Sequence, residues 1–308
     1  MNIAGANTPT LKNPGPESAD PSATRRTGLG LALVTAGISG VAVYLNSSGV
    51  RAFGDATAYT TAKNLVAAFV LLGIVAAAPA TGAQLTRPTR TGQWLGLALV
   101  GVLGGAVAFA LFFEGLARAS SVQAAFLHKT LVVWVAVLAV LVLRERLGLA
   151  HWAAIGLLLV GQAGLAGGLL TGWGVGESMI LAATLLWAVE VVVAKRLLVG
   201  LSSWTVACAR MGVGSGVLVG WLVVRGDAGA LVGMSAAQWG WVLLTGVLLA
   251  GYVSTWFAAL ARAGAVDVTA VLVLGALVTA VLAAGIDGVA LAPKLGWLTI
   301  LLAGGVLA

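Results

Sequence analysis

The chain has 308 residues, of which 60% are hydrophobic and 9% are charged, and its mean hydropathy is +1.05. A soluble domain typically carries about 25% charged residues, so this chain has too few to cover a water-exposed surface, and a cytosolic enzyme is excluded. With one cysteine, Cys208, and two histidines, His128 and His151, a disulfide framework and a cysteine-rich metal site are also excluded, and we expect neither metal nor cofactor.

The first 27 residues differ in composition from the rest of the chain. They hold four of the seven prolines, and asparagine, serine, threonine and glycine supply most of the remainder. Such a segment cannot bury apolar surface, so we predict a disordered cytoplasmic tail over residues 1–27. Arg25 and Arg26 precede the first apolar run and are interpreted as a positive anchor for the first helix, rather than as a twin-arginine export signal.

The remaining sequence predicts an all-α polytopic membrane protein. A hydrocarbon core of about 30 Å needs roughly 20 apolar residues in each helix. A membrane β-barrel is excluded, because its strands alternate apolar and polar residues, whereas Leu131 to Leu143 is continuously apolar. Ten membrane-spanning helices are predicted, near residues 28–46, 57–79, 92–114, 119–143, 149–169, 174–194, 203–224, 238–258, 264–285 and 291–308.

Lysine and arginine in the loops predict the orientation. With the N-terminus inside, ten basic residues fall on the cytoplasmic side and four on the outer side. We therefore expect a multi-pass protein of a bacterial or archaeal cytoplasmic membrane, with both termini cytoplasmic. The net charge of +7 is explained by topology, so no nucleic-acid partner is expected.

The two halves of the chain resemble each other. Leu116-Ala117-Arg118-Ala119 aligns with Leu260-Ala261-Arg262-Ala263 at an offset of 144, and Ala62-Lys63 occupies the place of Ala209-Arg210. Each half, residues 28–171 and 172–308, holds five predicted spans. Because five is odd, the halves must cross the membrane in opposite senses. Inverted-topology repeats recur among secondary transporters, whose substrate site lies near the membrane midplane at the repeat interface.

The fourth predicted span ends in the signature Arg144-Glu145-Arg146-Leu147-Gly148, and the fifth is rich in glycine. With its five-plus-five architecture, the chain resembles the EamA-type transporters of the drug/metabolite transporter (DMT) superfamily. The resemblance implies a central cavity enclosed by spans one to four and six to nine, with spans five and ten peripheral. It also implies transport of amino acids, other metabolites or drugs, often outward. The second half departs from the pattern, with Asp287-Gly288 where a second signature is expected.

Lys129 is the most conspicuous charge within a predicted span. A charged side chain at a helix centre costs roughly 2.5–3.5 kcal/mol on insertion scales, and its repeat counterpart is the neutral Val273. We expect Lys129 to face the cavity and to bind a substrate carboxylate; pairing that stabilises the bundle is the alternative. The neighbouring His128 either lines the cavity, where it could relay protons, or packs between helices.

Glu190 and Trp187 share one face of the sixth span. A carboxylate beside an aromatic ring could bind an ammonium group or carry a coupling proton, or Glu190 could pair with Lys195 or another basic residue near the cytoplasm. Together, Lys129 and Glu190 would fit the two ends of a zwitterion such as an amino acid. Three further aromatic residues are candidates to line the cavity, although packing is the usual role of such side chains: Trp134, Tyr252 and Trp256.

The remaining charges are given structural interpretations. Glu114 and Arg118 form an i, i+4 pair near the outer interface. Lys63 and Arg210 are expected at the membrane interface. Asp267, near the start of the ninth span, either gates the cavity or complements the helix dipole.

Glycines at four-residue spacing let helix backbones approach closely. This spacing predicts helix contacts along Gly101-Gly105, along Gly164-Gly168 and along Gly212-Gly216-Gly220.

We therefore predict a secondary active transporter, rather than an enzyme, that moves small organic metabolites such as amino acids, in the efflux direction, by alternating access. Its partners would be a small-molecule substrate, membrane lipids and, as a candidate coupling ion, protons, and it could act as a monomer or a homodimer. An intramembrane enzyme acting on a lipid-linked substrate is one alternative, and a channel is another.

Overall fold

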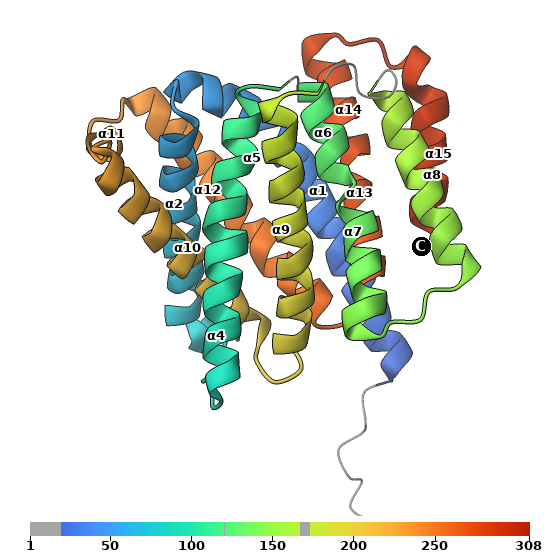
Figure 1. Ribbon diagram of the computed structural model, residues 1–308, viewed down its shortest axis with the longest axis horizontal. Helices are drawn as coiled ribbons and strands as arrows, with labels where there is room; N and C mark the ends of the chain where they lie inside the picture. The colour runs from blue at the N-terminus through green and yellow to red at the C-terminus, as the bar shows by residue number, and fades with distance from the viewer. Residues whose placement is uncertain (1–19, 120, 167–172) are drawn as a thin grey trace, which may run out of the picture.

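The computed structural model describes residues 20–119, 121–166 and 173–308, and within these ranges all regular secondary structure is helical. The helices run roughly side by side in one bundle (Figure 1). Eight of them are long and apolar enough to cross a membrane: Pro21–Phe53, Ala56–Ala76, Thr91–Leu116, Gln123–Leu143, Val175–Leu197, Ser203–Arg225, Ala236–Leu260 and Ala265–Asp287. Two shorter apolar helices cover Leu149–Leu165 and Ala292–Leu307.

Several of these segments are divided where the helix changes type or breaks. The first half contains α1 (Pro21–Phe53), α2 (Ala56–Ala76), α3 (Ala78–Thr81), α4 (Thr91–Leu99), η1 (Val100–Val107), α5 (Ala108–Leu116), α6 (Ser121–Lys129), α7 (Leu131–Leu138), η2 (Ala139–Leu143) and α8 (Leu149–Leu165). The second half contains α9 (Val175–Leu197), α10 (Ser203–Arg225), α11 (Gly229–Val232), α12 (Ala236–Leu260), α13 (Ala265–Val273), α14 (Gly275–Asp287), η3 (Ala292–Lys294) and α15 (Leu295–Leu307).

The first helix begins earlier than predicted. The expectation of a disordered tail to residue 27 is wrong for residues 21–27, which are the first turns of α1; residues 1–19 lie outside the described ranges. Asp20 caps the helix by accepting a hydrogen bond of 2.9 Å from the Ser22 backbone. Pro21 is at the first helical position, where its missing N–H costs nothing. Pro21, which the sequence analysis assigned to a disordered tail, is therefore the first residue of α1.

Two spans break in the same place in the two halves. The fourth span is interrupted at Thr130, between α6 and α7, and the ninth at Leu274, between α13 and α14. These two positions are 144 residues apart, which is the offset of the sequence repeat. At the first break the Leu127 carbonyl accepts hydrogen bonds from the Thr130 hydroxyl at 2.6 Å and from the Thr130 backbone N–H at 3.2 Å. Interrupted spans are common where transporters bind substrate.

The path of the chain reverses between the halves. In Figure 1, α1 runs from bottom to top, whereas its counterpart α9 runs from top to bottom. At one edge of the bundle, α8 packs mainly against α15, and both also contact α13. Their close approach requires Gly161, because a Cβ atom there would lie 2.9 Å from the Leu301 Cβ. These are the spans that the family resemblance placed at the periphery.

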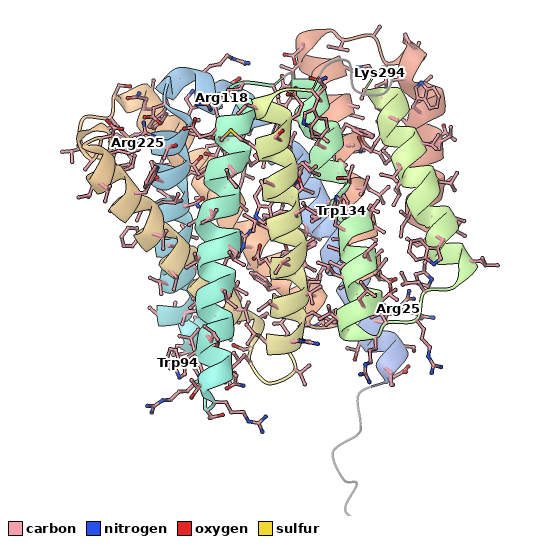
Figure 2. All side chains as sticks on the ribbon, in the orientation of Figure 1. Arg25, Trp94, Arg118, Trp134, Arg225 and Lys294 are labelled. Carbon is pink, nitrogen blue, oxygen red and sulfur yellow. The ribbon has the colours of Figure 1, made fainter. Side chains whose placement is uncertain are left out.

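The two ends of the bundle carry different loops. We call the end where α1 begins the N-terminal face, and the other end the opposite face. Figure 2 shows Arg25 and Trp94 at the N-terminal face and Arg118, Arg225 and Lys294 at the opposite face. These four basic residues lie at the two ends to which the sequence assigned them, and which end is cytoplasmic stays a prediction.

Of the three predicted glycine contacts, that of Gly101-Gly105 is present, and that of Gly164-Gly168 includes a residue outside the described ranges. A Cβ atom on Gly105 would lie 2.1 Å from the Arg210 carbonyl oxygen, and Gly105 packs directly on Gly214. The prediction for α10 chose the wrong face of the helix. Cβ atoms on Gly212, Gly216 or Gly220 would meet no atom of another described helix within 4 Å. Only Gly214, on the opposite side of α10, allows this approach.

Candidate functional site

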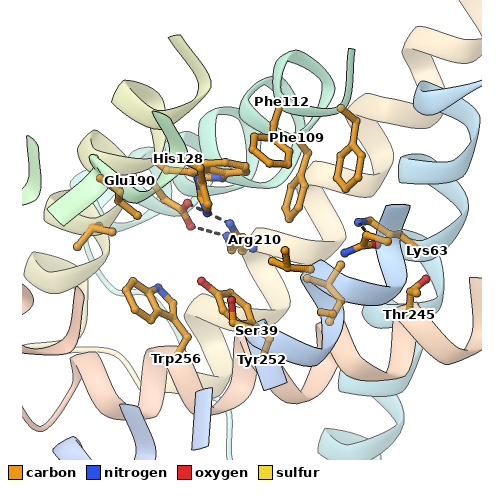
Figure 3. A pocket seen from close by; sticks show the side chains of 18 residues that line it. Ser39, Lys63, Phe109, Phe112, His128, Glu190, Arg210, Thr245, Tyr252 and Trp256 are labelled. Carbon is orange, nitrogen blue, oxygen red and sulfur yellow. Dashed lines mark hydrogen bonds and ion pairs between the residues drawn. The ribbon is translucent and has the colours of Figure 1, made fainter. Parts of the chain in front are cut away.

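A cavity of about 130 Å³ lies between the two halves of the bundle. Its wall comes from α1, α2, α5, α6, α7, α9, α10 and α12, so both halves contribute (Figure 3). The lining residues are Ser39, Ala42, Val43, Asn46, Lys63, Phe109, Phe112, Phe113, His128, Leu131, Trp187, Glu190, Val191, Arg210, Thr245, Leu249, Tyr252 and Trp256.

A buried ion pair joins α9 and α10 at this wall. Arg210 donates from Nε to Glu190 Oε1 at 2.5 Å and from Nη2 to Glu190 Oε2 at 3.2 Å, so the guanidinium engages both carboxylate oxygens (Figure 3). Glu190 is 3% exposed and Arg210 is 5% exposed. Such pairs are bidentate and charge-assisted, which makes them stronger than neutral hydrogen bonds. The two charges cancel each other within the wall.

The backbone of η1 supports this pair. The Gly104 carbonyl accepts a hydrogen bond from Arg210 Nη2 at 3.2 Å and another from Trp187 Nε1 at 3.1 Å. Gly104 lies in a π-helical segment, a form that is rare and often occurs at functional sites. A Cβ atom at this position would lie 2.0 Å from the Glu190 carboxyl carbon. The glycine is therefore required for the Glu190 carboxylate to occupy its position.

Lys63 brings a second buried cation to the cavity. Its side chain is on α2 and only 3% exposed, and its Nζ donates to Asn46 Oδ1 at 3.3 Å. The ammonium lies over three aromatic rings, at 3.9 Å from the ring centroid of Phe113, 5.1 Å from Tyr59 and 5.6 Å from Phe109. Such cation–π contacts partly compensate a cation for its lost hydration.

Aromatic side chains form most of the apolar wall. The rings of Tyr252 and Trp256 are stacked, with centroids 6.0 Å apart and planes 9° from parallel. His128 contacts the rings of Phe112 and Trp187 at centroid distances of 5.1 and 5.0 Å. Its Nδ1 is buried and has no hydrogen-bond partner within the described ranges. One unsatisfied polar atom therefore borders the cavity among the rings.

Five of the seven residues proposed from the sequence line this cavity: His128, Trp187, Glu190, Tyr252 and Trp256. The other two, Lys129 and Trp134, are not among its lining residues. Lys129 is 9% exposed and follows His128 directly, so the two side chains point about 100° apart on the helix. The Trp134 indole instead donates to the Thr130 hydroxyl at 3.2 Å.

The two cations that sequence reasoning placed at the membrane interface are in fact buried in the cavity wall. Lys63 and Arg210 were assigned to the interface because each lies only about two turns from its helix end. The distance of a residue from the helix end does not determine whether its side chain faces the lipid or the interior of the bundle. The available signal was the repeat itself, since the same position in both halves holds a basic residue. Glu190 pairs with Arg210 rather than with Lys195, which donates to the Leu260 and Ala263 carbonyls at 2.6 Å.

Contacts between the halves close the N-terminal face. Asp267, at the start of α13, accepts hydrogen bonds from Arg25 at 2.9 and 3.3 Å and lies 3.4 Å from His151 Nε2. Glu145, from the predicted signature, accepts from the backbone N–H of Ala265 at 3.1 Å and so caps α13.

Three further contacts among the described residues join the halves at the opposite face. Arg225 lies 3.9 Å from Asp55, and Gln238 donates to the Ala52 carbonyl at 3.4 Å. The Tyr44 hydroxyl donates to Asp287 at 2.9 Å in an exposed position. The hydrogen bonds of Asp267 and Glu145 are partly buried, whereas that between Tyr44 and Asp287, although equally short, is exposed.

The comparison with family models decides the classification. The model of the EamA-like transporter family matches the chain twice, over residues 26–166 and 174–308. The chain belongs to the EamA-like transporter family. It is therefore an integral, multi-pass membrane protein of the drug/metabolite transporter type, as its composition and its long apolar helices also indicate.

Other comparisons bear on the fold alone. One protein of known crystal structure has a TM-score of 0.67 to this EamA-like chain, with 15% sequence identity, and the match covers 90% of this chain and 95% of that one. No curated protein matches the sequence. Neither comparison says what this family member transports.

Proposed function

We propose that this EamA-like protein is a secondary active transporter of small organic metabolites that works by alternating access. Ten spans, eight long helices and the two shorter ones, would form two five-helix repeats of inverted topology. The observation that carries the proposal is a cavity whose wall comes from both repeats and holds buried charged side chains. Buried charges in a membrane are costly, and they mark substrate or ion pathways.

The contacts that close the N-terminal face support this mechanism. Arg25 and Glu145 belong to the first repeat, and their partners in α13 belong to the second. Opening that end of the cavity requires these contacts to break. The contacts at the opposite face are longer or more exposed, so we propose that the described conformation is closed toward the N-terminal face. By the distribution of basic residues, that face would be cytoplasmic.

Counterflow in proteoliposomes tests the proposal. Vesicles loaded with an unlabelled metabolite should accumulate the same labelled compound, and a pH gradient should change the rate if protons are coupled. Ser39→Trp places an indole in the cavity and should abolish counterflow. The matched control, Gly212→Trp, puts the same side chain on an exposed position of α10 with no neighbour within 4 Å, and should leave counterflow intact.

Two results would contradict this function. Equal inhibition by both tryptophan substitutions would mean that the cavity is not the route. Passive flux that neither saturates nor shows counterflow would indicate a channel.

A further inference from the structure

The unusual feature of this cavity is a buried ammonium group without an acidic partner. Within the described part of the chain, no carboxylate lies within 4 Å of Lys63 Nζ. An ammonium group has three N–H donors, and the recorded hydrogen bond is the one of 3.3 Å to Asn46. Burying a charge without a partner is expensive, so this arrangement is expected to be retained for a function.

The surroundings of Lys63 hold the group in place. The Tyr59 hydroxyl lies 2.7 Å from Asn46 Oδ1 and 3.0 Å from the Thr245 hydroxyl, which itself donates to a backbone carbonyl of α12. These contacts fix the amide oxygen that faces Lys63. The rings of Phe109 and Phe113 cover the ammonium from the side. The ammonium is therefore positioned before any ligand arrives, which lowers the ordering cost of binding.

The other charges of the wall determine which ligand would fit. The charged lining residues are Lys63, Arg210 and Glu190, and the last two are paired through both carboxylate oxygens. The cavity thus presents one uncompensated positive charge. A zwitterion or an amine would find no free carboxylate in the wall for its ammonium group. A dianionic phosphate would be matched by only one cation. A monoanion is the complementary ligand.

We propose that Lys63 binds the carboxylate of an organic monoanion whose apolar body lies among the aromatic side chains of the cavity. The body would contact Phe112, Trp187, Tyr252 and Trp256, which line the same cavity (Figure 3). This proposal rests on the proposed function, because it takes the cavity to be the substrate site. The sequence suggested a zwitterion held by Lys129 and Glu190. The proposed ligand is instead a monoanion, and the residue that binds its carboxylate is Lys63.

Binding to the purified protein in detergent tests the assignment. The probes are 3-phenylpropionate and its neutral amide, 3-phenylpropanamide, with phenylalanine as the zwitterion and 2-phenylethylamine as the cation. We expect the acid to bind about 10- to 100-fold more tightly than the amide, as is typical of a hydrogen bond to a charged group. Phenylalanine and the amine should bind more weakly than the acid.

Matched variants test which residue causes the preference for the acid over the amide. Lys63→Met should reduce the acid-to-amide ratio to about one, whereas Lys63→Arg should keep most of it. Lys129→Met is the control, because it removes a buried lysine that does not line the cavity, and it should leave the ratio unchanged. If Lys63→Met does not survive purification, Lys63→Gln replaces it.

The outcomes separate this site from the transport function. Equal binding of acid and amide by the wild type, or loss of the preference in Lys129→Met instead of Lys63→Met, overturns the site. Counterflow of labelled 3-phenylpropionate is measured separately. Selective binding of the acid without counterflow supports the site and contradicts the transport function. Counterflow of the amide or the amine without a preference for the acid supports the transport function and contradicts the site.

Discussion

At the scale of single residues, Gly104 determines the chemistry of the cavity wall. Its carbonyl accepts hydrogen bonds from both Arg210 and Trp187, and the absence of a side chain makes room for the Glu190 carboxylate. The first-half segment η1 and the second-half helices α9 and α10 therefore meet at one backbone group. In lipid, where water does not supply alternative partners, every such backbone acceptor matters.

Replacement of this glycine should be poorly tolerated. We predict that Gly104→Ala lowers the free energy of unfolding by about 1–3 kcal/mol, the usual cost of overpacking, because the new methyl group displaces Glu190. Thermal unfolding in detergent, followed by tryptophan fluorescence, measures the effect. Gly212→Ala is the control, since its methyl group meets no atom within 4 Å. Equal melting temperatures for the two variants would show that Gly104 does not constrain the pair.

The ion pair itself should behave as a unit. Glu190→Gln leaves Arg210 buried without its counter-charge, and breaking a buried pair in this way costs about 3–5 kcal/mol. Adding Arg210→Gln removes the stranded charge and should recover part of that loss. A double-mutant cycle on the melting curves provides the coupling energy. Additive effects of the two substitutions would mean that the pair contributes nothing as a pair.

At the scale of helices, the two interrupted spans are the notable elements. The breaks at Thr130 and Leu274 occupy equivalent positions, although one follows a lysine and the other follows Val273. The interruption is thus a property of the repeat rather than of one side chain. Below the second break, α13 is anchored at its start by Glu145 from the other half.

The cap on α13 gives a prediction at this scale. Glu145→Ala removes the acceptor for the Ala265 N–H and should destabilise the start of α13 by about 0.5–2 kcal/mol, the typical cost of losing a helix cap. Hydrogen–deuterium exchange should accelerate in peptides that cover the first turns of α13. Arg146→Ala, an exposed neighbour in the same signature, should not change the exchange. Unchanged exchange in Glu145→Ala would refute the capping role.

The sequence predicted elements better than it predicted which way side chains face. Continuous apolar runs are long enough to specify spans, and the repeat located equivalent positions in both halves. The orientation of Lys63 and Arg210 was missed because these helices are apolar on most sides, so periodicity does not distinguish a lipid-facing side from a cavity-facing one. Lys129 was predicted to face the cavity because it lies deep in its span, but the side chain that lines the cavity is that of the adjacent His128.

At the scale of the whole molecule, the two halves form a bundle with the substrate-site candidate between them and different contacts at its two ends. The Arg25–Asp267 contact ties the halves together at the N-terminal face, while the opposite face has the 3.9 Å approach of Arg225 to Asp55. A transporter that alternates must weaken one set of contacts as the other strengthens. The two faces should therefore respond to a perturbation in opposite directions.

Cysteine accessibility measures this coupling directly. With Cys208 replaced by alanine, Ser39→Cys provides a single thiol in the cavity wall, and a membrane-impermeant maleimide is added from either side of sealed vesicles. We predict labelling from both sides, faster from the opposite face. Adding Asp267→Asn should raise the rate from the N-terminal face and lower it from the opposite face. Labelling from one side only, or a rise at one face without a fall at the other, would contradict alternating access.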